Sequence, residues 1–447
     1  MLYTKNLHRK LFAVATAAIV LSSCQVVASD KVITLRLDEP QSSTSPAGAQ
    51  SEIVVPPSRQ VSAPMPAVKG ACAVLMDAAT GQVLYAKNPH MHRPNASTTK
   101  MMTAILMIEH CKMTDIITAS KNASETPFTS LHLKPGEQIT VHDLLTGMLI
   151  RSANDAAVAA AEHIAGSTQK FAQMMNRKAA EIGCFDTNFV TPNGLYNKNH
   201  YSSAYDLCLI ARYGFRYPEF NEAVCTRKYC LASRTINKND IVVFSKSKFL
   251  KDYPGADGVK SGYIKQAGYC YVGSATRNGW RLVSSVLKSD NAGRDTIAMM
   301  DYGFANYQHV NVAKAGSICG KAVIGGGDSK LVAVAPKQTL MVSVPRTGAK
   351  IITRFEFNQA QAPILKGAKL GKMVALVNGK QAAKVDLCAT KDVGISLARR
   401  TLTWFKTCGI LTACLVVGGK YGTAFTKGTR RRRRRVTTSL RGYNRYR

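Results

Sequence analysis

The segment GYCYVGSATRNGWRLVSSVL, residues 268–287, decides the fold of the largest part of this chain. Two apolar runs, at 268–276 and 280–287, flank the dipeptide Asn278-Gly279. Asn-Gly between such runs is the strongest short-range signal for a β-hairpin, because both residues accept the positive φ angles of a tight hairpin turn. The segment therefore predicts two neighbouring antiparallel strands.

Earlier segments predict the remainder of the same folding unit. Short apolar runs at 73–76 and 82–85 flank a turn and predict two further strands. Helical spacing of apolar residues begins at Ser97 and ends near His110, and residues 141–165 predict two helices that meet at 151–154. Helices placed between early and late strands indicate an α/β unit whose sheet is closed by segments far apart in the sequence.

Composition limits the classes of protein that remain. The chain has 447 residues, of which 46% are hydrophobic and 19% charged, so a disordered or collagen-like protein is excluded. No run of eighteen apolar residues occurs, which excludes a polytopic membrane protein. Residues 310–390 change to short alternating strands with Gly and Pro turns and predict a separate small β domain.

The N-terminus has the pattern of an export signal, which we place at residues 1–28. Basic residues at positions 5–10 precede a short apolar stretch and then small residues. Two cleavage sites remain open. Val26-Val27-Ala28 suits cleavage before Ser29, whereas residues 21–24 resemble a bacterial lipobox that would make Cys24 a lipidated N-terminus. Residues 29–68 are rich in Ser, Pro, Ala and Gln, which predicts a flexible linker.

The formal net charge of +33 is unevenly spread and is densest at the C-terminal end of the chain. After Asp392 there are fourteen Lys and Arg residues and no acidic residue. We expect a membrane-associated segment at 393–420, either spanning or lying at an anionic membrane surface, followed by a basic tail at 421–447. A nucleic-acid partner for the arginine run is disfavoured, because an exported protein rarely meets one.

The tetrapeptide Ser97-Thr98-Thr99-Lys100 is the first candidate for catalysis. Residues i and i+3 lie on one face of a helix, so the Lys100 amine can lie beside the Ser97 hydroxyl. A serine becomes an effective nucleophile when a neighbouring base takes its proton, and a desolvated lysine can be that base. Taken alone, the same residues describe a helix cap followed by a surface lysine.

Two further motifs follow in order. Ser152 and Asn154 lie where the two predicted helices meet, and offer a hydroxyl for proton relay and an amide for substrate binding. Lys260-Ser261-Gly262 enters a predicted strand and offers a cation, a hydroxyl donor and a place of close backbone approach. If that strand lies at a sheet edge, a peptide substrate can bind by strand addition.

This ordered set resembles the S-x-x-K, Ser-x-Asn and K-T-G elements of penicillin-binding proteins and β-lactamases. Over residues 70–390 the chain is similar to the D-alanyl-D-alanine carboxypeptidase family, the low-molecular-mass penicillin-binding proteins. The supporting stretches are 71–86, 133–137, 191–195, 200–202, 255–262, 274–277 and 362–367. The resemblance implies a β-lactamase/transpeptidase-like α/β catalytic domain at 69–307, with an antiparallel sheet and helices on both faces. A small all-β domain at 308–392 would follow.

The resemblance also implies roles for individual residues. Ser97 would attack the carbonyl of the penultimate D-alanine of a peptidoglycan stem pentapeptide, and Lys100 would be the general base. Ser152 would protonate the departing D-alanine. The residues implied in substrate binding are Asn154 for the amide, Lys260 and Ser261 for the terminal carboxylate, Gly262, Tyr263 with Ser97 for the oxyanion, and Arg294 for the carboxylate. β-Lactams would be covalent inhibitors.

Departures from the family pattern leave alternatives open. Ser261 stands where the family usually has threonine, and Asn193 and Tyr196 also differ from family-typical residues. A β-lactamase of the same fold is one alternative, and a non-catalytic module that binds cell wall or membrane is another. We expect no cofactor and no metal site, since the twelve cysteines show no paired CxxC pattern. The expected location is the periplasmic face of a bacterial cytoplasmic membrane.

Overall fold

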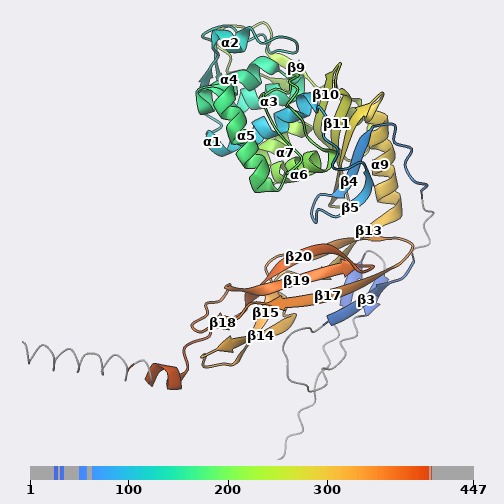
Figure 1. Cartoon of the computed structure of the whole chain (residues 1–447), viewed down its shortest axis with the longest axis vertical. Coiled ribbons are helices and arrows are strands. Elements are labelled where there is room, and N and C mark those ends of the chain that lie inside the picture. Colours follow the sequence, from blue (N-terminus) through green and yellow to red (C-terminus); the bar gives the residue numbers. More distant parts are fainter. Residues whose placement is uncertain (1–24, 29–30, 35–49, 58–62, 402–403, 405–447) are drawn as a thin grey trace, which may run out of the picture.

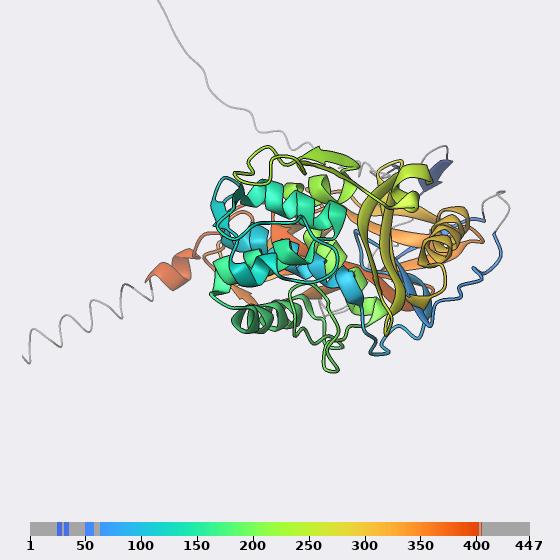
Figure 2. The same cartoon turned by 90° about the horizontal axis from the view of Figure 1, so that it is seen from above.

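The computed structural model describes residues 25–28, 31–34, 50–57, 63–401 and 404 (Figures 1 and 2). Cys24 and most of the predicted export signal lie outside these residues, as does the basic tail at 421–447. The predicted membrane-associated segment is described only up to residue 401 and at Trp404. Among the described residues, no helix combines the length and hydropathy that crossing a membrane requires.

A five-stranded antiparallel sheet forms the centre of the larger domain (Figure 1). Its strands, in spatial order, are β10 (Ala256–Ile264), β11 (Gly268–Arg277), β12 (Trp280–Ser289), β4 (Cys72–Asp77) and β5 (Val83–Lys87). The predicted hairpin is confirmed, because Arg277 pairs with Trp280 across a turn in which Asn278 and Gly279 have φ angles of 50° and 76°. Strand β10 is an edge strand, as the substrate-binding hypothesis requires.

Helices cover both faces of this sheet, which confirms the predicted fold class. One face carries α1 (Lys100–His110), α3 (Val141–Arg151), α4 (Asn154–Ala165), α5 (Thr168–Ile182), α6 (Ala204–Gly214) and α7 (Pro218–Cys225). The other face carries α9 (Ala292–Asn306). Smaller elements complete the domain: α2 (Lys121–Ser124), α8 (Lys248–Asp252), β6 (Ile116–Thr118), β7 (Gln138–Thr140), β8 (Lys228–Cys230) and β9 (Val242–Phe244).

The strands bury apolar side chains on both faces because each face meets helices. In β4, Val74 and Met76 belong to the core on the α1 side, whereas Ala73 and Leu75 belong to the core on the α9 side. This alternation follows from the two-residue period of a strand. A strand buried on both faces reads as a continuous apolar run, and the stretch at 72–76 does so.

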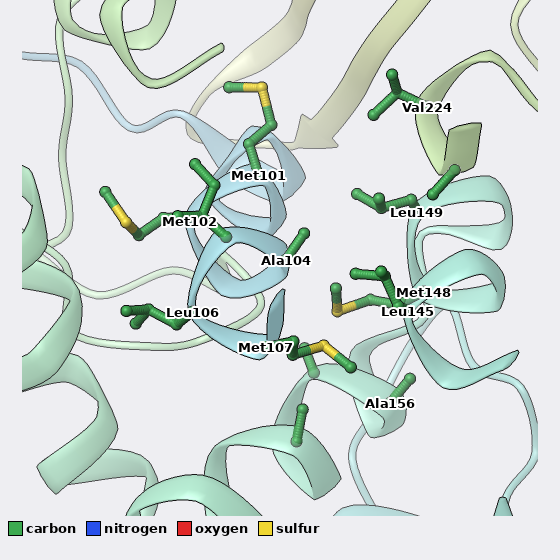
Figure 3. Packing of buried hydrophobic residues seen from close by; sticks show 14 of the residues in the cluster. Met101, Met102, Ala104, Leu106, Met107, Leu145, Met148, Leu149, Ala156 and Val224 are labelled. Carbon is green, nitrogen blue, oxygen red and sulfur yellow. The ribbon is translucent and has the colours of Figure 1, made fainter. Parts of the chain in front are cut away.

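Helix α1 lies at the centre of the largest core (Figure 3). Its residues Met101 and Met107 have no exposed surface, and they pack among side chains of α3, α4 and α7. A helix that is apolar around most of its circumference must be buried on all sides. Because α1 begins at Lys100, this burial carries the lysine inside the domain as well.

The second domain is all β, as predicted. Its seven-stranded sheet has the order β18 (Ala360–Gln361), β14 (Gly320–Gly325), β15 (Leu331–Pro336), β20 (Lys380–Ala389), β19 (Lys369–Val377), β17 (Ala349–Phe357) and β3 (Gln50–Val55). A two-stranded pair, β13 (Tyr307–Ala313) and β16 (Leu340–Pro345), completes it. These strands enclose a core of their own.

The predicted flexible linker at 29–68 is wrong for residues 50–55. This stretch is strand β3, which pairs antiparallel with β17 and places Ile53 opposite Ile351. Ile53 and Val55 are buried in the core of the β domain, whereas Val54 between them points outward and is 64% exposed. Composition could not reveal this strand, because its pairing partner lies about 300 residues later. Residues 31–34 of the same segment form β2, which pairs with β1 (Gln25–Ala28).

The two domains contact each other through Asp77 at the end of β4. Its carboxylate accepts a hydrogen bond from the Ser343 hydroxyl of β16 at 2.6 Å and one from the Trp280 indole at 3.3 Å. The side-chain amide of Gln82 bonds the backbone N–H and C=O of Ser343. Since Asp77 is fully buried, these bonds tie the β domain to the central sheet of the catalytic domain.

Strand β3 yields a stability prediction. Ile53→Ala should lower the free energy of unfolding by about 2–5 kcal/mol, since it removes a buried aliphatic side chain and leaves a cavity. Val54→Ala is the matched control on the same strand, and it should change stability by less than about 0.5 kcal/mol because Val54 is exposed. Urea denaturation of the intact protein measures both. Equal effects of the two changes would contradict the assignment of β3 to the core.

Candidate active site

The Ser97 hydroxyl lies on a tight turn at the entrance to α1. The predicted helix start is a 3₁₀ helix, Ala96–Thr99, which leads directly into α1. Asn95 closes the turn, because its carbonyl accepts from Thr98 Oγ1 at 2.7 Å and its side-chain amide donates to the hydroxyls of Thr98 and Thr99. The turn brings Ser97 Oγ within 2.9 Å of Lys100 Nζ, as the i, i+3 spacing predicted.

Lys100 has no exposed surface, and its amine is surrounded by oxygen atoms. Besides Ser97 Oγ, the Nζ atom contacts Asn154 Oδ1 at 2.8 Å and the backbone carbonyl of Asn193 at 2.8 Å. The Asn154 amide is oriented by a bond from its Nδ2 to the carbonyl of Pro127, which can only accept. Two of the three neighbours of Nζ are therefore obligate acceptors, and the third is the Ser97 hydroxyl.

This arrangement defines what a neutral lysine does here. A neutral amine has two hydrogens and one lone pair. The hydrogens satisfy the oxygens of Asn154 and Asn193, so the lone pair faces Ser97 and can accept its proton. Burial lowers the pKa of Lys100 well below 10.5, and the positive charge of Lys260 lowers it further, while Asp155 opposes the shift.

Ser152 ends α3 in a left-handed conformation, with a φ of 64°, and α4 begins two residues later at Asn154. The backbone N–H of Asn154 bonds the carbonyl of Thr129, which ties the helix junction to the loop at 127–133. The carboxylate of Asp155 secures the same loop through Ser130 Oγ and the backbone N–H groups of Leu131 and Leu133. The predicted meeting of two helices at 151–154 is confirmed.

Strand β10 supplies the third part of the site. Lys260 is 4% exposed, and its Nζ donates to the carbonyl of Ser261 at 2.8 Å. Burial lowers the pKa of Lys260 to about 7. Gly262 packs so closely against the turn at 96–99 that a Cβ atom there would lie 2.8 Å from the backbone nitrogen of Ser97. A glycine is required at this position, because any side chain would displace β10 from Ser97.

A cavity of about 720 Å³ opens onto these residues. Its lining includes Ser97, Ser152, Lys260, Ser261, Gly262 and Tyr263, so six of the nine predicted site residues face one space. Lys100 and Asn154 are buried and do not line the cavity. Lys100 contacts the lining residue Ser97, and Asn154 contacts Lys100. Arg294 is exposed on the first turn of α9 and does not line the cavity, although its neighbour Gly293 does.

Basic side chains dominate the charged part of the lining. Arg151, Lys246 and Lys248 join Lys260 there, and Asp290 is the one carboxylate among the lining residues. Arg151 is already paired with Asp240 at 2.8 Å. The cavity is therefore suited to a ligand that carries negative charge. Within the described residues, no group of His, Cys, Asp and Glu side chains has the geometry of a metal site, and the nine cysteines there are free.

Two contributors to this site had no predicted role, although both lie in stretches that support the family resemblance. The Asn193 carbonyl is a backbone group, so its residue type gave no signal beyond the neighbouring Gly194, whose φ is 84°. His200 is buried beside the turn at 96–99, where its Nε2 lies 2.9 Å from Thr99 Oγ1. A histidine in an otherwise polar stretch indicated no chemistry by itself.

Both domains of this chain are similar in sequence to known proteins. Residues 59–291 match the D-alanyl-D-alanine carboxypeptidase family, and residues 307–394 match the family described as penicillin-binding protein 5, C-terminal domain. The D-alanyl-D-alanine carboxypeptidase DacF of Bacillus subtilis is 33% identical over 75% of this chain and 90% of its own length. The corresponding DacA of Haemophilus influenzae is 33% identical over 74% and 86%.

Solved structures give the same result. Penicillin binding protein 5 from Haemophilus influenzae matches with a TM-score of 0.63 and 31% identity, covering 75% of this chain and 99% of that one. Penicillin binding protein 6B from Escherichia coli matches with a TM-score of 0.56 and 28% identity, covering 73% and 96%. With both domains matched in order, and with serine and lysine in contact at the cavity, the chain belongs to the D-alanyl-D-alanine carboxypeptidase family of serine peptidases.

Proposed function

We propose that this enzyme removes the terminal D-alanine from peptidoglycan stem pentapeptides through an acyl-enzyme on Ser97. The observation that carries the proposal is the 2.9 Å contact between Ser97 Oγ and the buried Lys100 Nζ. Burial keeps the amine available as a base, and the two acceptors at Asn154 and Asn193 direct its lone pair toward the hydroxyl.

Acylation then proceeds with these groups in defined roles. Lys100 takes the proton of Ser97, and Ser97 Oγ forms a bond to the carbonyl carbon of the penultimate D-alanine. The backbone N–H groups of Ser97 and Tyr263 stabilise the oxyanion, which is supported by the close approach of Gly262 to the Ser97 nitrogen. The C–N bond breaks as Ser152 donates its proton to the departing D-alanine nitrogen and recovers one from Lys100, which becomes neutral again. In deacylation, Lys100 takes a proton from water while the water oxygen bonds to the acyl carbon. The bond to Ser97 Oγ then breaks, and Lys100 returns the proton to Ser97 as the shortened peptide leaves.

The terminal carboxylate of the substrate meets the cationic side of the cavity. Ser261 and Lys260 lie on the edge strand, where a peptide can add as a further strand while its carboxylate reaches both side chains. Lys246 and Lys248 also line the cavity and add positive charge near this anchor. Arg294 remains a candidate for the same carboxylate, but its exposed position on α9 makes the two lysines the stronger candidates.

The alternatives are less well supported. Rapid hydrolysis of β-lactams commonly uses an additional carboxylate base, yet the Asp155 carboxylate is already committed to Ser130, Leu131 and Leu133. Asp290 lines the cavity, but the contacts of Ser97 and Lys100 within the described residues do not include its carboxylate. A non-catalytic module would have no use for a fully buried lysine in contact with a serine, because burying an amine is costly. We therefore propose a hydrolase that β-lactams acylate and inhibit.

We propose that the protein acts outside the cytoplasmic membrane, where its peptidoglycan substrate lies. The basic n-region and apolar stretch at the N-terminus support export. Attachment to an anionic membrane surface through residues 393–420 rests on the apolar sequence and the arginine run alone.

The nucleophile assignment predicts a single covalent adduct. After incubation with labelled penicillin, mass spectrometry of the wild-type protein should show one adduct, on the peptide that contains Ser97. Ser97→Ala should form no adduct and release no D-alanine, while its melting temperature stays close to that of the wild type because Ser97 is half-buried and small. Full labelling of a folded Ser97→Ala protein would overturn the proposal.

The carboxylate anchor predicts a pH dependence. Lys260 is cationic below its pKa of about 7 and becomes neutral above it, so kcat/KM for a D-alanyl-D-alanine peptide should fall as the pH rises through about 7. Lys260→Arg should move that fall to higher pH, because a guanidinium stays protonated. Steady-state D-alanine release between pH 5 and 10 measures it.

Ser261→Ala is the matched control for this pH dependence. It should lower kcat/KM by about tenfold or more at every pH, because it removes a hydrogen bond to a charged group, and it should leave the fall near pH 7 in place. An unchanged basic limb in the Lys260→Arg enzyme would show that Lys260 is not the titrating anchor.

A further inference from the structure

His200 joins the two segments that surround Lys100. The imidazole is 3% exposed and lies between the nucleophile turn at 96–99 and the loop at 190–195. Neither of its ring nitrogens contacts Ser97 or Lys100, so His200 has no part in the proton transfers described above. It is held from the side by the ring of Phe189, with centroids 5.7 Å apart in an edge-to-face arrangement.

The hydrogen bonds fix the tautomer of this histidine. Nδ1 faces the backbone N–H groups of Val190 at 3.0 Å and Thr191 at 3.3 Å, and both can only donate. Nδ1 is therefore the unprotonated acceptor, and the proton resides on Nε2, which donates to Thr99 Oγ1 at 2.9 Å. Burial and the neighbouring charge of Lys100 lower the pKa of His200 to about 4, in agreement with a neutral ring.

Thr99 connects His200 to the other residues of the nucleophile turn. Its hydroxyl donates to the carbonyl of Ala96 at 2.8 Å and accepts from the side-chain amide of Asn95 at 2.9 Å. Ala96 precedes the nucleophile and has a φ of 48°, in the left-handed region that is unfavourable for alanine. The chain of bonds from His200 through Thr99 therefore holds the turn in the conformation that presents Ser97.

The loop at 190–195, which His200 contacts through Nδ1, supplies a hydrogen-bond acceptor for Lys100. The 190–195 loop places the Asn193 carbonyl 2.8 Å from Lys100 Nζ. The loop lies directly against the turn, since a Cβ atom on Gly194 would lie 1.9 Å from the Ala96 carbonyl oxygen. A shift of the loop relative to the turn would change the angle at which the lysine lone pair faces Ser97.

We propose that His200 is a positioning residue that fixes the Ser97 turn and the Asn193 loop relative to each other, so that the Lys100 lone pair is aimed at Ser97. This inference rests on the proposed acylation of Ser97. It adds a neutral histidine that acts on the nucleophile through Thr99, without touching the substrate.

The test is a double-mutant cycle on the rate of acylation by labelled penicillin. Thr99→Val and His200→Asn should each slow acylation by about ten- to a hundredfold, the range expected when reacting groups are misplaced by a fraction of an ångström to about 1 Å. The KM for a D-alanyl-D-alanine peptide should change by only a few-fold, because neither residue lines the cavity.

The two conservative replacements of His200 separate its two bonds. Asparagine can keep an acceptor near the position of Nδ1 but does not reach Thr99, whereas glutamine can keep an N–H near the position of Nε2. Thr99→Val should therefore cost less in the His200→Asn background than in the wild type, and should keep its cost in the His200→Gln background. His142→Asn is the control, because His142 bonds Tyr229 instead. It should acylate at the wild-type rate.

The outcomes are distinct. Wild-type protein that forms no adduct would overturn the proposed function itself. Wild-type acylation together with additive effects of Thr99→Val and His200→Asn would overturn the positioning role. So would variants that only melt at lower temperature, while the folded fraction acylates at the wild-type rate.

Discussion

The buried Lys100 amine links the packing of the catalytic domain to its proposed chemistry. An ammonium without solvent is strongly disfavoured, so the folded protein favours the neutral amine that the proposed acylation requires. Burial alone would leave an amine pointing in any direction. The oxygens of Asn154 and Asn193 remove that freedom, since each accepts one hydrogen and the lone pair is left to face Ser97. The contacts of Lys100 Nζ therefore fix both the position of the amine and the direction of its lone pair.

The fold supplies each of these groups from a different element. Asn154 begins α4, Ser97 lies in the turn at 96–99, and Lys260 lies on edge strand β10. Gly262 lets β10 approach the turn, so the proposed carboxylate anchor and the proposed nucleophile share one cavity. The β domain is tied to the far end of the same sheet through Asp77 and Ser343, and β3 joins its sheet from before the catalytic domain.

The sequence was informative where local chemistry decides structure. Asn278-Gly279 predicted the hairpin, and the i, i+3 spacing of Ser97 and Lys100 predicted their contact, because turn geometry and helix periodicity act over a few residues. It was uninformative where structure depends on distant partners. The composition of residues 29–68 predicted a linker. Strand β3 within it could not be predicted, because its partner β17 lies about 300 residues later. The role of the Asn193 carbonyl was invisible because any residue has that group. Arg294 follows the family pattern in sequence but lies outside the cavity lining.

Direct titration of Lys100 in the folded enzyme shows whether its amine is the neutral base of the proposed mechanism. The protein would be labelled with ¹³C at the lysine ε carbon, and the Lys100 resonance would be assigned by its loss in Lys100→Arg. Its chemical shift would then be followed against pH by NMR. A buried, neutral Lys100 predicts a titration midpoint well below 10.5, the ordinary value for lysine. In the unfolded protein the midpoint should return to about 10.5. A midpoint at or above 10.5 in the folded protein would contradict the proposed neutral base.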